Sequence, residues 1–434
     1  MSDRRNDANF LEAVMVESGA TAERRTEPER ASPVFITAYA IAYLGLWVAL
    51  ITPVVVSLAV RVQQIDPDGK EGSLALVTGV GALLALIANP FFGRLSDRTT
   101  SRFGMRRPWL VGGALAGTLG LAVVSTAQGV PVLLLGWCLA QAGLNAVLAA
   151  LTALLPDQVP TEQRGRVSGL LGMAMAAATV IGTFLAQALQ DSAFWMFMAP
   201  GLLGLVPALL LAAMLRDRVL PASERPRYDA GEFARSFWVN PVAHPDFGWA
   251  WLSRFLLFMG VATLLTYQAY YLTDRLHVPA DEVARLVFVA TLVQTVFTVA
   301  GSNASGWMSD KLGRRKVFVL GSAAVFGIGL LVIALAGSFP VFLVGMAITG
   351  LGQGVYLAVD LALVADVLPD RDSDAGKDLG VFNIANALPQ SLAPAIAPVF
   401  LAVGGGGNYP VLFGAAAAFA VLGALSIHPV RRIR

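Results

Sequence analysis

Twelve apolar runs, each about as long as a lipid bilayer is thick, dominate this chain. They cover roughly residues 34–59, 73–93, 109–128, 130–155, 167–189, 193–215, 249–273, 283–307, 316–337, 340–367, 379–402 and 409–429. Backbone polar groups find no water partners inside a membrane, so uninterrupted apolar runs of this length predict helices. We therefore expect an all-α, polytopic membrane protein with twelve transmembrane helices.

Composition agrees with a membrane environment. Only 14% of the 434 residues are charged and the mean hydropathy is +0.66, whereas soluble domains carry about 25% charged residues. Residues 1–32 are polar and predict a disordered cytoplasmic tail, with a short amphipathic surface helix as the alternative. The first apolar run is too long for the core of a signal peptide. Cys138 is the only cysteine, so we expect neither a disulfide nor a cysteine metal cluster.

The lysines and arginines predict how the chain is oriented. Of the 31 basic residues, 26 fall in the N-terminal tail, the even-numbered loops and the C-terminus, and four fall in the odd-numbered loops. Basic residues accumulate on the cytoplasmic side of membrane proteins. We expect a multi-pass plasma-membrane protein with both termini in the cytoplasm, and the basic residues indicate topology rather than nucleic-acid binding.

A short charged stretch occurs twice. Gly93 begins the sequence GRLSDR, and Gly306 begins GWMSDK, 213 residues later. The sequence PVLLLG matches PVFLVG, and Leu155-Pro156-Asp157 matches Leu368-Pro369-Asp370. We expect two six-helix bundles, residues 33–215 and 249–429, joined by a charged cytoplasmic linker over 216–248 and followed by a cytoplasmic C-terminus, 430–434.

This duplication resembles the major facilitator superfamily of secondary transporters, whose two six-helix halves each carry such a stretch after the second span. The first copy, SDRTTSRFGMRRP, has four more residues than the second and resembles the sucrose–proton and glycoside–cation symporters within that superfamily. The resemblance implies that the second span packs on the eleventh and the eighth on the fifth. It also implies that the first, fourth, seventh and tenth spans line a central cavity.

The charged stretches are expected to gate the cytoplasmic face. The fifth and eleventh spans begin on that side, where helix N-termini carry partial positive charge that attracts an aspartate. The glycine before each aspartate would let the helices approach closely. The alternative for the arginines is that they only enforce topology. The gating candidates are Gly93, Asp97, Arg98 and Arg106 in the first copy, and Gly306, Asp310, Lys311 and Arg314 in the second.

Polar and aromatic side chains at helical spacing mark the expected cavity helices. Rings that stack on C–H faces and amides that exchange hydrogen bonds suit an uncharged polyol such as a sugar. The alternative is that the aromatic residues are packing or interfacial residues. The substrate-binding candidates are Tyr39, Tyr43, Trp47, Trp137, Gln141, Asn145, Tyr267, Gln268, Tyr271, Gln353, Tyr356, Asn383 and Asn386.

Arg254 and Asp360 are ionisable residues inside predicted spans. Such a residue costs about 3 kcal/mol on insertion scales, so its presence calls for a functional or pairing explanation. At a rise of about 1.5 Å per residue, Arg254 lies roughly 8 Å and Asp360 roughly 14 Å from the cytoplasmic ends of their spans, which are similar depths. We expect them to pair and Asp360 to couple proton movement to transport. The alternative is an ion pair that only fixes helix register.

These features favour a secondary active transporter of a small polar solute, with a sugar or glycoside as substrate and a proton as the coupling ion. The alternatives are proton-driven efflux of amphipathic drugs and a non-transporting membrane sensor. Efflux is supported by four methionines that could line an apolar cavity: Met173, Met175, Met196 and Met198. The three histidines are far apart and there is no phosphate-binding glycine loop, so we expect no enzyme, no metal and no cofactor. We expect a monomer in the lipid bilayer.

Overall fold

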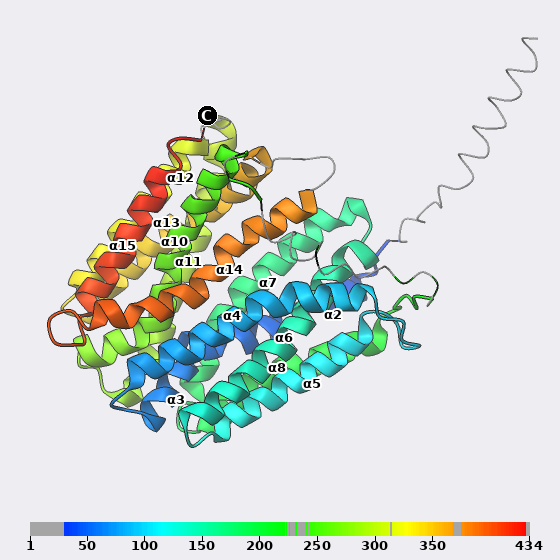
Figure 1. The fold of residues 1–434 in the computed structure, drawn as a ribbon, viewed down its shortest axis with the longest axis horizontal. Coiled ribbons are helices and arrows are strands. Elements are labelled where there is room, and N and C mark those ends of the chain that lie inside the picture. The colour runs from blue at the N-terminus through cyan, green and yellow to red at the C-terminus, as the bar shows by residue number, and fades with distance from the viewer. Residues whose placement is uncertain are drawn as a thin grey trace, which may run out of the picture.

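The computed structural model describes residues 30–221, 223, 225, 231, 239–241, 243–312, 315–367 and 375–430. For 306–312, 315, 361–367 and 375–380 it describes the backbone alone. All regular structure in the described residues is helical (Figure 1). Twelve of the helices or continuous helix pairs are long and apolar enough to cross a membrane, and each overlaps one predicted span. The all-α polytopic fold is confirmed.

The first half contains six spans. The first span is interrupted by a π-helical turn and consists of α2 Pro33–Thr52, η1 Pro53–Ser57 and α3 Leu58–Ile65. The other five are α4 Lys70–Asp97, α5 Arg107–Thr126, α6 Val130–Gln158, α7 Thr161–Ala188 and α8 Ala193–Met214. Polar caps begin two of these helices: the hydroxyls of Ser32 and Ser192 accept from the backbone N–H groups of Phe35 and Trp195, as helix starts require.

The second half repeats this order. Its first span is α10 Pro245–Tyr270 continued by a second π-helical turn, η3 Tyr271–Arg275. The remaining spans are α11 Ala280–Leu312, α12 Arg315–Leu335, α13 Phe339–Val367, α14 Ala375–Leu401 and α15 Tyr409–Ser426. The side chain of Asn408 caps α15 by accepting from Val411 N–H.

Helix packing is equivalent in the two halves. In the first half, α2 packs on α7 and α8, α4 packs on α6, and α5 packs on α6 and α8. In the second half, the equivalent contacts join α10 to α14 and α15, α11 to α13, and α12 to α13 and α15. Glycines allow the closest of these contacts. A Cβ on Gly143 would lie 2.3 Å from the backbone nitrogen of Gly117, and one on Gly354 would lie 2.0 Å from the carbonyl oxygen of Thr298. Small residues of this kind are the usual basis of helix association in membranes.

The halves meet at one end of the bundle. We call the end where α8 ends and α10 begins the linker end, and the opposite end, where the halves meet, the far end. Between the halves, α4 contacts α14, α7 contacts α11, and α10 contacts η1 and α3. Phe184 and Phe288, near the far end, have ring centres 5.7 Å apart. In Figure 1 the helices of the two halves converge toward the far end and diverge toward the linker end.

Candidate functional site

Arg254 and Asp360 form an ion pair inside the second half. Arg254 lies about two and a half turns into α10. Asp360 lies on α13, about two turns before that helix ends. Their side chains are joined by an Nη1 to Oδ2 distance of 2.6 Å and are only 12% and 3% exposed. The pairing expected from the sequence is confirmed.

Aromatic rings surround the arginine of this pair. The guanidinium carbon of Arg254 is 5.5 Å from the ring centre of Phe258 and 5.1 Å from that of Phe382 on α14. Trp251, one turn before Arg254, donates a hydrogen bond to the carbonyl of Val381 at 3.0 Å. The arginine is thus held where α10, α13 and α14 meet, and its charge is stabilised by ring faces as well as by the carboxylate.

The ion pair leaves polar atoms of both partners available. Asp360 Oδ1 and Arg254 Nε are buried and have no hydrogen-bond partner among the described protein atoms. Tyr356 lies one helical turn before Asp360 and is itself buried. A carboxylate with one oxygen bound and one free can still accept a hydrogen bond from a solute hydroxyl while its ion pair is intact.

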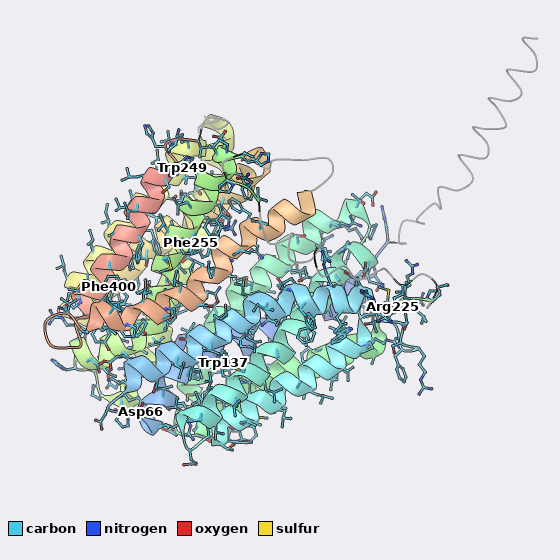
Figure 2. All side chains as sticks on the ribbon, viewed as in Figure 1. Asp66, Trp137, Arg225, Trp249, Phe255 and Phe400 are labelled. Carbon is cyan, nitrogen blue, oxygen red and sulfur yellow. The ribbon has the colours of Figure 1, made fainter. Side chains whose placement is uncertain are left out.

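In the first half, the candidate residues differ in their access to a solute. Tyr39 is fully buried, and its hydroxyl donates to the carbonyl of Leu151 on α6 at 2.6 Å. Trp137 is fully buried between α4 and α6, with its ring against Gly81; Figure 2 places it among the helices of this half. We assign both to packing. Tyr43 and Trp47 are partly exposed, and their rings are 6.2 Å apart in an edge contact.

Gln141 and Asn145 form a polar pair on α6. The side-chain amide of Asn145 donates to the backbone carbonyl of Gln141 at 2.9 Å and to its side-chain oxygen at 3.1 Å. Both residues are buried. They lie one turn apart, as their spacing in the sequence predicts, and they satisfy each other in part.

In the second half, Tyr271 points away from the first half. Its hydroxyl donates to the carbonyls of Ile333 and Ala336 at 2.6 and 2.8 Å, and its ring is packed against Phe342 and Phe413. We therefore assign Tyr271 to the core of the second half rather than to a solute site. Its two carbonyl partners, at the end of α12 and directly after it, hold η3 at the end of the seventh span.

The remaining candidates of this half are more varied. Tyr267 is buried and donates to the carbonyl of Pro394 at 3.4 Å, while both amide atoms of the buried Gln268 have no partner among the described residues. Gln353 is partly exposed and accepts from Gln294 at 3.5 Å. On α14, Asn383 is exposed and Asn386 partly exposed.

At the linker end, Arg106 organises the first charged loop. Its guanidinium contacts Asp97 at 2.7 Å, Asp157 at 2.9 Å and the hydroxyl of Ser96 at 2.7 Å. Burial alone would lower the pKa of Arg106, but the carboxylates of Asp157 and Asp97 outweigh it and raise this pKa above its usual value. The arginine therefore remains charged and joins the loop to the ends of α4 and α6.

The expected gating contacts of this loop are not formed in this arrangement. Asp97 is 55% exposed, and its ion pair with Arg106 stays within the first half. A Cβ added to Gly93 would have no neighbour within 4 Å among the described residues. The close helix approach expected at Gly93 is therefore absent here, because the halves diverge at this end. Arg98 has partners of its own.

The second copy of the gating stretch lies outside the described side chains. This holds for Gly306, Asp310 and Lys311, while Arg314 falls outside the described residues altogether. Their gating role stays a prediction.

Sequence reasoning missed two residues that position elements of the first half. Asp217, which follows α8, accepts hydrogen bonds from the backbone N–H groups of Arg106 and Arg107 at 2.7 and 2.8 Å. It thereby anchors the start of the linker to the charged loop. Gly81 allows α4 to pack directly on Trp137. Asp217 could have been found as a helix-capping residue type, but nothing in the sequence places it beside α5.

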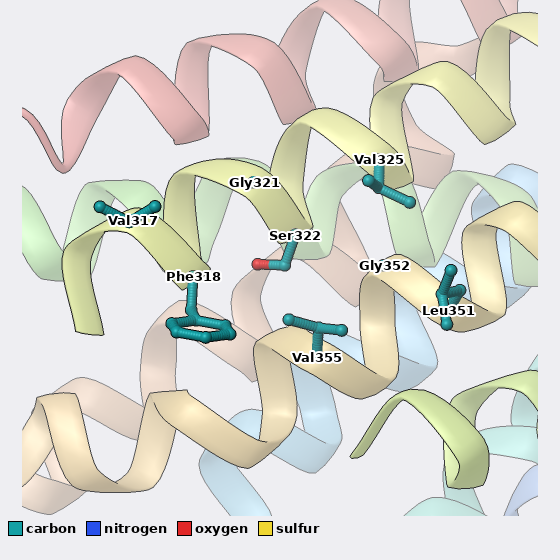
Figure 3. Close-up of a pocket in the computed structure, with 8 residues that line it drawn as sticks. All are labelled: Val317, Phe318, Gly321, Ser322, Val325, Leu351, Gly352 and Val355. Atoms are coloured by element: carbon teal, nitrogen blue, oxygen red, sulfur yellow. The ribbon is translucent and has the colours of Figure 1, made fainter. Parts of the chain in front are cut away.

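Two cavities lie away from these residues. One, of about 270 Å³, is lined by Val317, Phe318, Gly321, Ser322, Val325, Leu351, Gly352 and Val355 between α12 and α13 (Figure 3). Its walls are almost wholly apolar, which does not suit a polar solute. The other, of about 350 Å³, lies at the far end between the two halves. Among the described residues, no group of three or more His, Cys, Asp or Glu side chains is placed to hold a metal ion.

Comparison with known proteins gives consistent matches. The sequence model of the Major Facilitator Superfamily matches residues 35–303 and again residues 250–432. Protein PucC of Cereibacter sphaeroides is 24% identical over 408 residues, covering 82% of this chain and 84% of PucC. The uncharacterized MFS-type transporter YfiU of Bacillus subtilis is 34% identical over 96 residues, which cover 22% of this chain and only 18% of YfiU.

Solved structures of transporters share the fold. The inward-facing, occupied form of a bacterial homologue of the human lysosomal transporter Spinster has a TM-score of 0.71 at 15% identity, over 92% of this chain and 96% of that one. A D-xylose–proton symporter has a TM-score of 0.68 at 17% identity, over 92% and 98%. At such identities the likeness concerns the arrangement of helices.

Proposed function

Because this chain belongs to the Major Facilitator Superfamily, we propose that it is a secondary active transporter that moves a small polar solute across the plasma membrane by alternating access. The observation that carries the proposal is the buried ion pair between Arg254 and Asp360, 2.6 Å long. Ionisable groups inside transmembrane segments commonly serve ion pathways and proton relays. We propose a proton as the coupling ion, since a single carboxylate suffices to carry it.

The coupling follows from what happens when the pair separates. In the present arrangement Arg254 compensates the negative charge of Asp360. If α10 and α13 shift against each other as the halves repack, the carboxylate loses its cation in a region of low dielectric. A proton then neutralises it, because an unpaired buried charge is far more costly than a neutral acid. When Arg254 pairs with Asp360 again, the proton leaves the carboxylate. It is released on the opposite side of the membrane from the one on which it was taken up.

The solute is proposed to be an uncharged polyol, such as a sugar or a glycoside. Five candidates are partly or fully exposed and are aromatic or carry amides: Tyr43, Trp47, Gln353, Asn383 and Asn386. The charge of Arg254 is already compensated by Asp360. These side chains therefore provide stacking faces and neutral hydrogen-bond partners, which suit hydroxyl groups better than an ionic solute. The long first charged loop, with its resemblance to sucrose–proton symporters, supports the same solute class.

The orientation is proposed from the distribution of basic residues. Both termini and the linker are placed in the cytoplasm, so the far end, where the halves converge, is the extracellular end. A reporter fused after Arg434 is expected to be active only if it functions in the cytoplasm. Activity of a reporter that works only outside the cytoplasm would contradict this orientation.

Counterflow in proteoliposomes tests the function. Purified protein is reconstituted, loaded with one unlabelled solute, and exposed to the radiolabelled form of sucrose, other sugars and glycosides, or cationic amphipathic drugs. We expect transient accumulation of at least one sugar or glycoside above empty liposomes. Counterflow of drugs alone would support drug efflux, which is also consistent with the exposed Met173 and Met175 on α7. Flux of no solute in either panel would favour the sensor hypothesis.

A further inference from the structure

An ion pair joins the two halves at the far end. Lys70 is the first residue of α4, and Asp274 lies in the π-helical turn η3 that ends the seventh span. The distance from Lys70 Nζ to Asp274 Oδ1 is 2.5 Å, and the two side chains are only 14% and 25% exposed. The other pairs described above, of Arg254 and of Arg106, each lie within one half.

Asp274 is fixed in place by its own half. Its second oxygen, Oδ2, accepts from the hydroxyl of Tyr409 on α15 at 2.6 Å, and Oδ1 also accepts from the hydroxyl of Thr273 at 2.8 Å. Both carboxylate oxygens thus have partners within the second half. These partners orient the side chain so that Oδ1 faces Lys70. An acceptor held in this way loses less side-chain entropy when the lysine binds than a free surface aspartate would.

Tyr270 adds a second polar link between the halves. Its ring lies 5.0 Å from Lys70 Nζ, and its hydroxyl donates to the carbonyl of Ala59 on α3 at 3.0 Å. Ala59 lies two residues after η1 and Tyr270 directly precedes η3, so this contact lies beside the π-helical turns of both spans. Such turns are frequent at functional sites in helices.

Apolar packing is incomplete beside these contacts. The cavity of about 350 Å³ is walled by Gln64 and Gln190 from the first half and by Tyr270, Thr273 and Asp281 from the second. A cavity between two packed surfaces forfeits dispersion contacts on both sides. Closure of the far end therefore depends more on these polar contacts than it would if apolar side chains packed the interface without a gap.

We propose that Lys70, Asp274 and Tyr409 form a latch that holds the far end of the transporter closed and must break before a solute can enter or leave at that end. Lys70 and Asp274 are its two sides, and Tyr409 is a positioning residue that orients the carboxylate. The latch controls the balance between two arrangements of the halves and contacts no solute. Its test therefore does not depend on which solute is carried.

Spin-label distances across the far end measure this balance. The labels are placed at Gln128→Cys, in the turn between α5 and α6, and at Ser338→Cys, in the turn between α12 and α13; both positions are exposed. Cys138 is the only native cysteine and is replaced by serine. In liposomes, Lys70→Ala and Asp274→Asn should each raise the ratio of long to short distances at least about fivefold, the lower limit for typical coupling between sites.

Two further variants separate a latch from general damage. The charge-exchanged double variant, Lys70→Asp with Asp274→Lys, should return the distances toward the short population, since both hydroxyls around position 274 can also accept from an ammonium group. Tyr409→Phe keeps the ring and should raise the long population less than Asp274→Asn does. The matched control is Glu282→Gln, which breaks the far-end pair of Glu282 with Arg285, 3.0 Å apart within one half, and should change nothing.

Two results would overturn the latch. One is a wild-type distance distribution in both Lys70→Ala and Asp274→Asn, each shown to be folded by an unchanged thermal unfolding midpoint. The other is a charge-exchanged variant that resembles the single variants, since it would show that the two side chains act separately.

Discussion

Arg254 and Asp360 place opposite charges where either charge alone would be costly to bury. Their side chains are 12% and 3% exposed, and a buried ion pair that loses one partner leaves the other charge without compensation. Removal of both charges avoids that cost. The stability of the pair and its role in coupling can therefore be separated by comparing single and double variants.

Arg254→Ala is expected to destabilise the protein by about 3 kcal/mol, because Asp360 would remain buried and unpaired. The double variant Arg254→Met with Asp360→Leu should be within about 1 kcal/mol of the wild type, since its side chains fill similar space without charge. Equilibrium unfolding in mixed micelles measures both. If the double variant were as unstable as the single one, packing around Arg254 rather than charge would explain the loss.

At the scale of helices and loops, the charged loop after α4 is a rigid unit of the first half. Arg106 joins Asp97 to Asp157, and Asp217 binds the backbone at the start of α5. The loop therefore moves with its half. Closure at the linker end would bring Asp97, now 55% exposed, toward the N-terminus of α14.

Asp97→Asn should lower transport more than it lowers solute binding, because the lost interaction belongs to the arrangement closed at the linker end. Binding is measured by isothermal titration in detergent and transport by counterflow, with Asp246→Asn, a variant at the start of α10, for comparison. Equal loss of binding and transport at unchanged protein level would indicate faulty assembly instead.

Two glycines of α4 make a matched pair. A Cβ at Gly81 would lie 2.2 Å from Trp137 Nε1, whereas one at Gly93 would have no described neighbour within 4 Å. Gly81→Ala should therefore destabilise the protein by about 1–3 kcal/mol. Gly93→Ala should leave stability unchanged. It should lower transport if Gly93 packs closely against another helix only when the linker end closes. Normal transport by Gly93→Ala would remove this glycine from the gate.

The sequence predicts depth in the membrane better than it predicts the direction a side chain faces. Arg254 and Asp360 could be paired because charge inside a span is rare and helical rise fixes its depth. Helical spacing predicts Trp137 and Tyr271 as cavity residues, yet both are fully buried in their own halves. Lipid and protein core are both apolar, so the apolar pattern of a span does not reveal which side faces its neighbours.

Across the whole molecule, the two repeated halves converge at the far end and diverge at the linker end (Figure 1). Helix pairs within each half are extensive and equivalent, while contacts between halves involve fewer helices. This is the organisation expected of two rigid bodies that rock about a site between them. In the proposed mechanism, protonation of Asp360 is what makes that rocking depend on a proton.

The Asp360→Asn protein is compared with the wild type in proteoliposomes, with a solute identified by counterflow. The asparagine has nearly the same shape as the aspartate but cannot take up and release a proton. We predict that solute exchange between the two sides persists, while accumulation against a gradient driven by a pH difference is lost. If the Asp360→Asn protein still accumulated the solute uphill when only the pH difference drives it, Asp360 would not be the coupling residue.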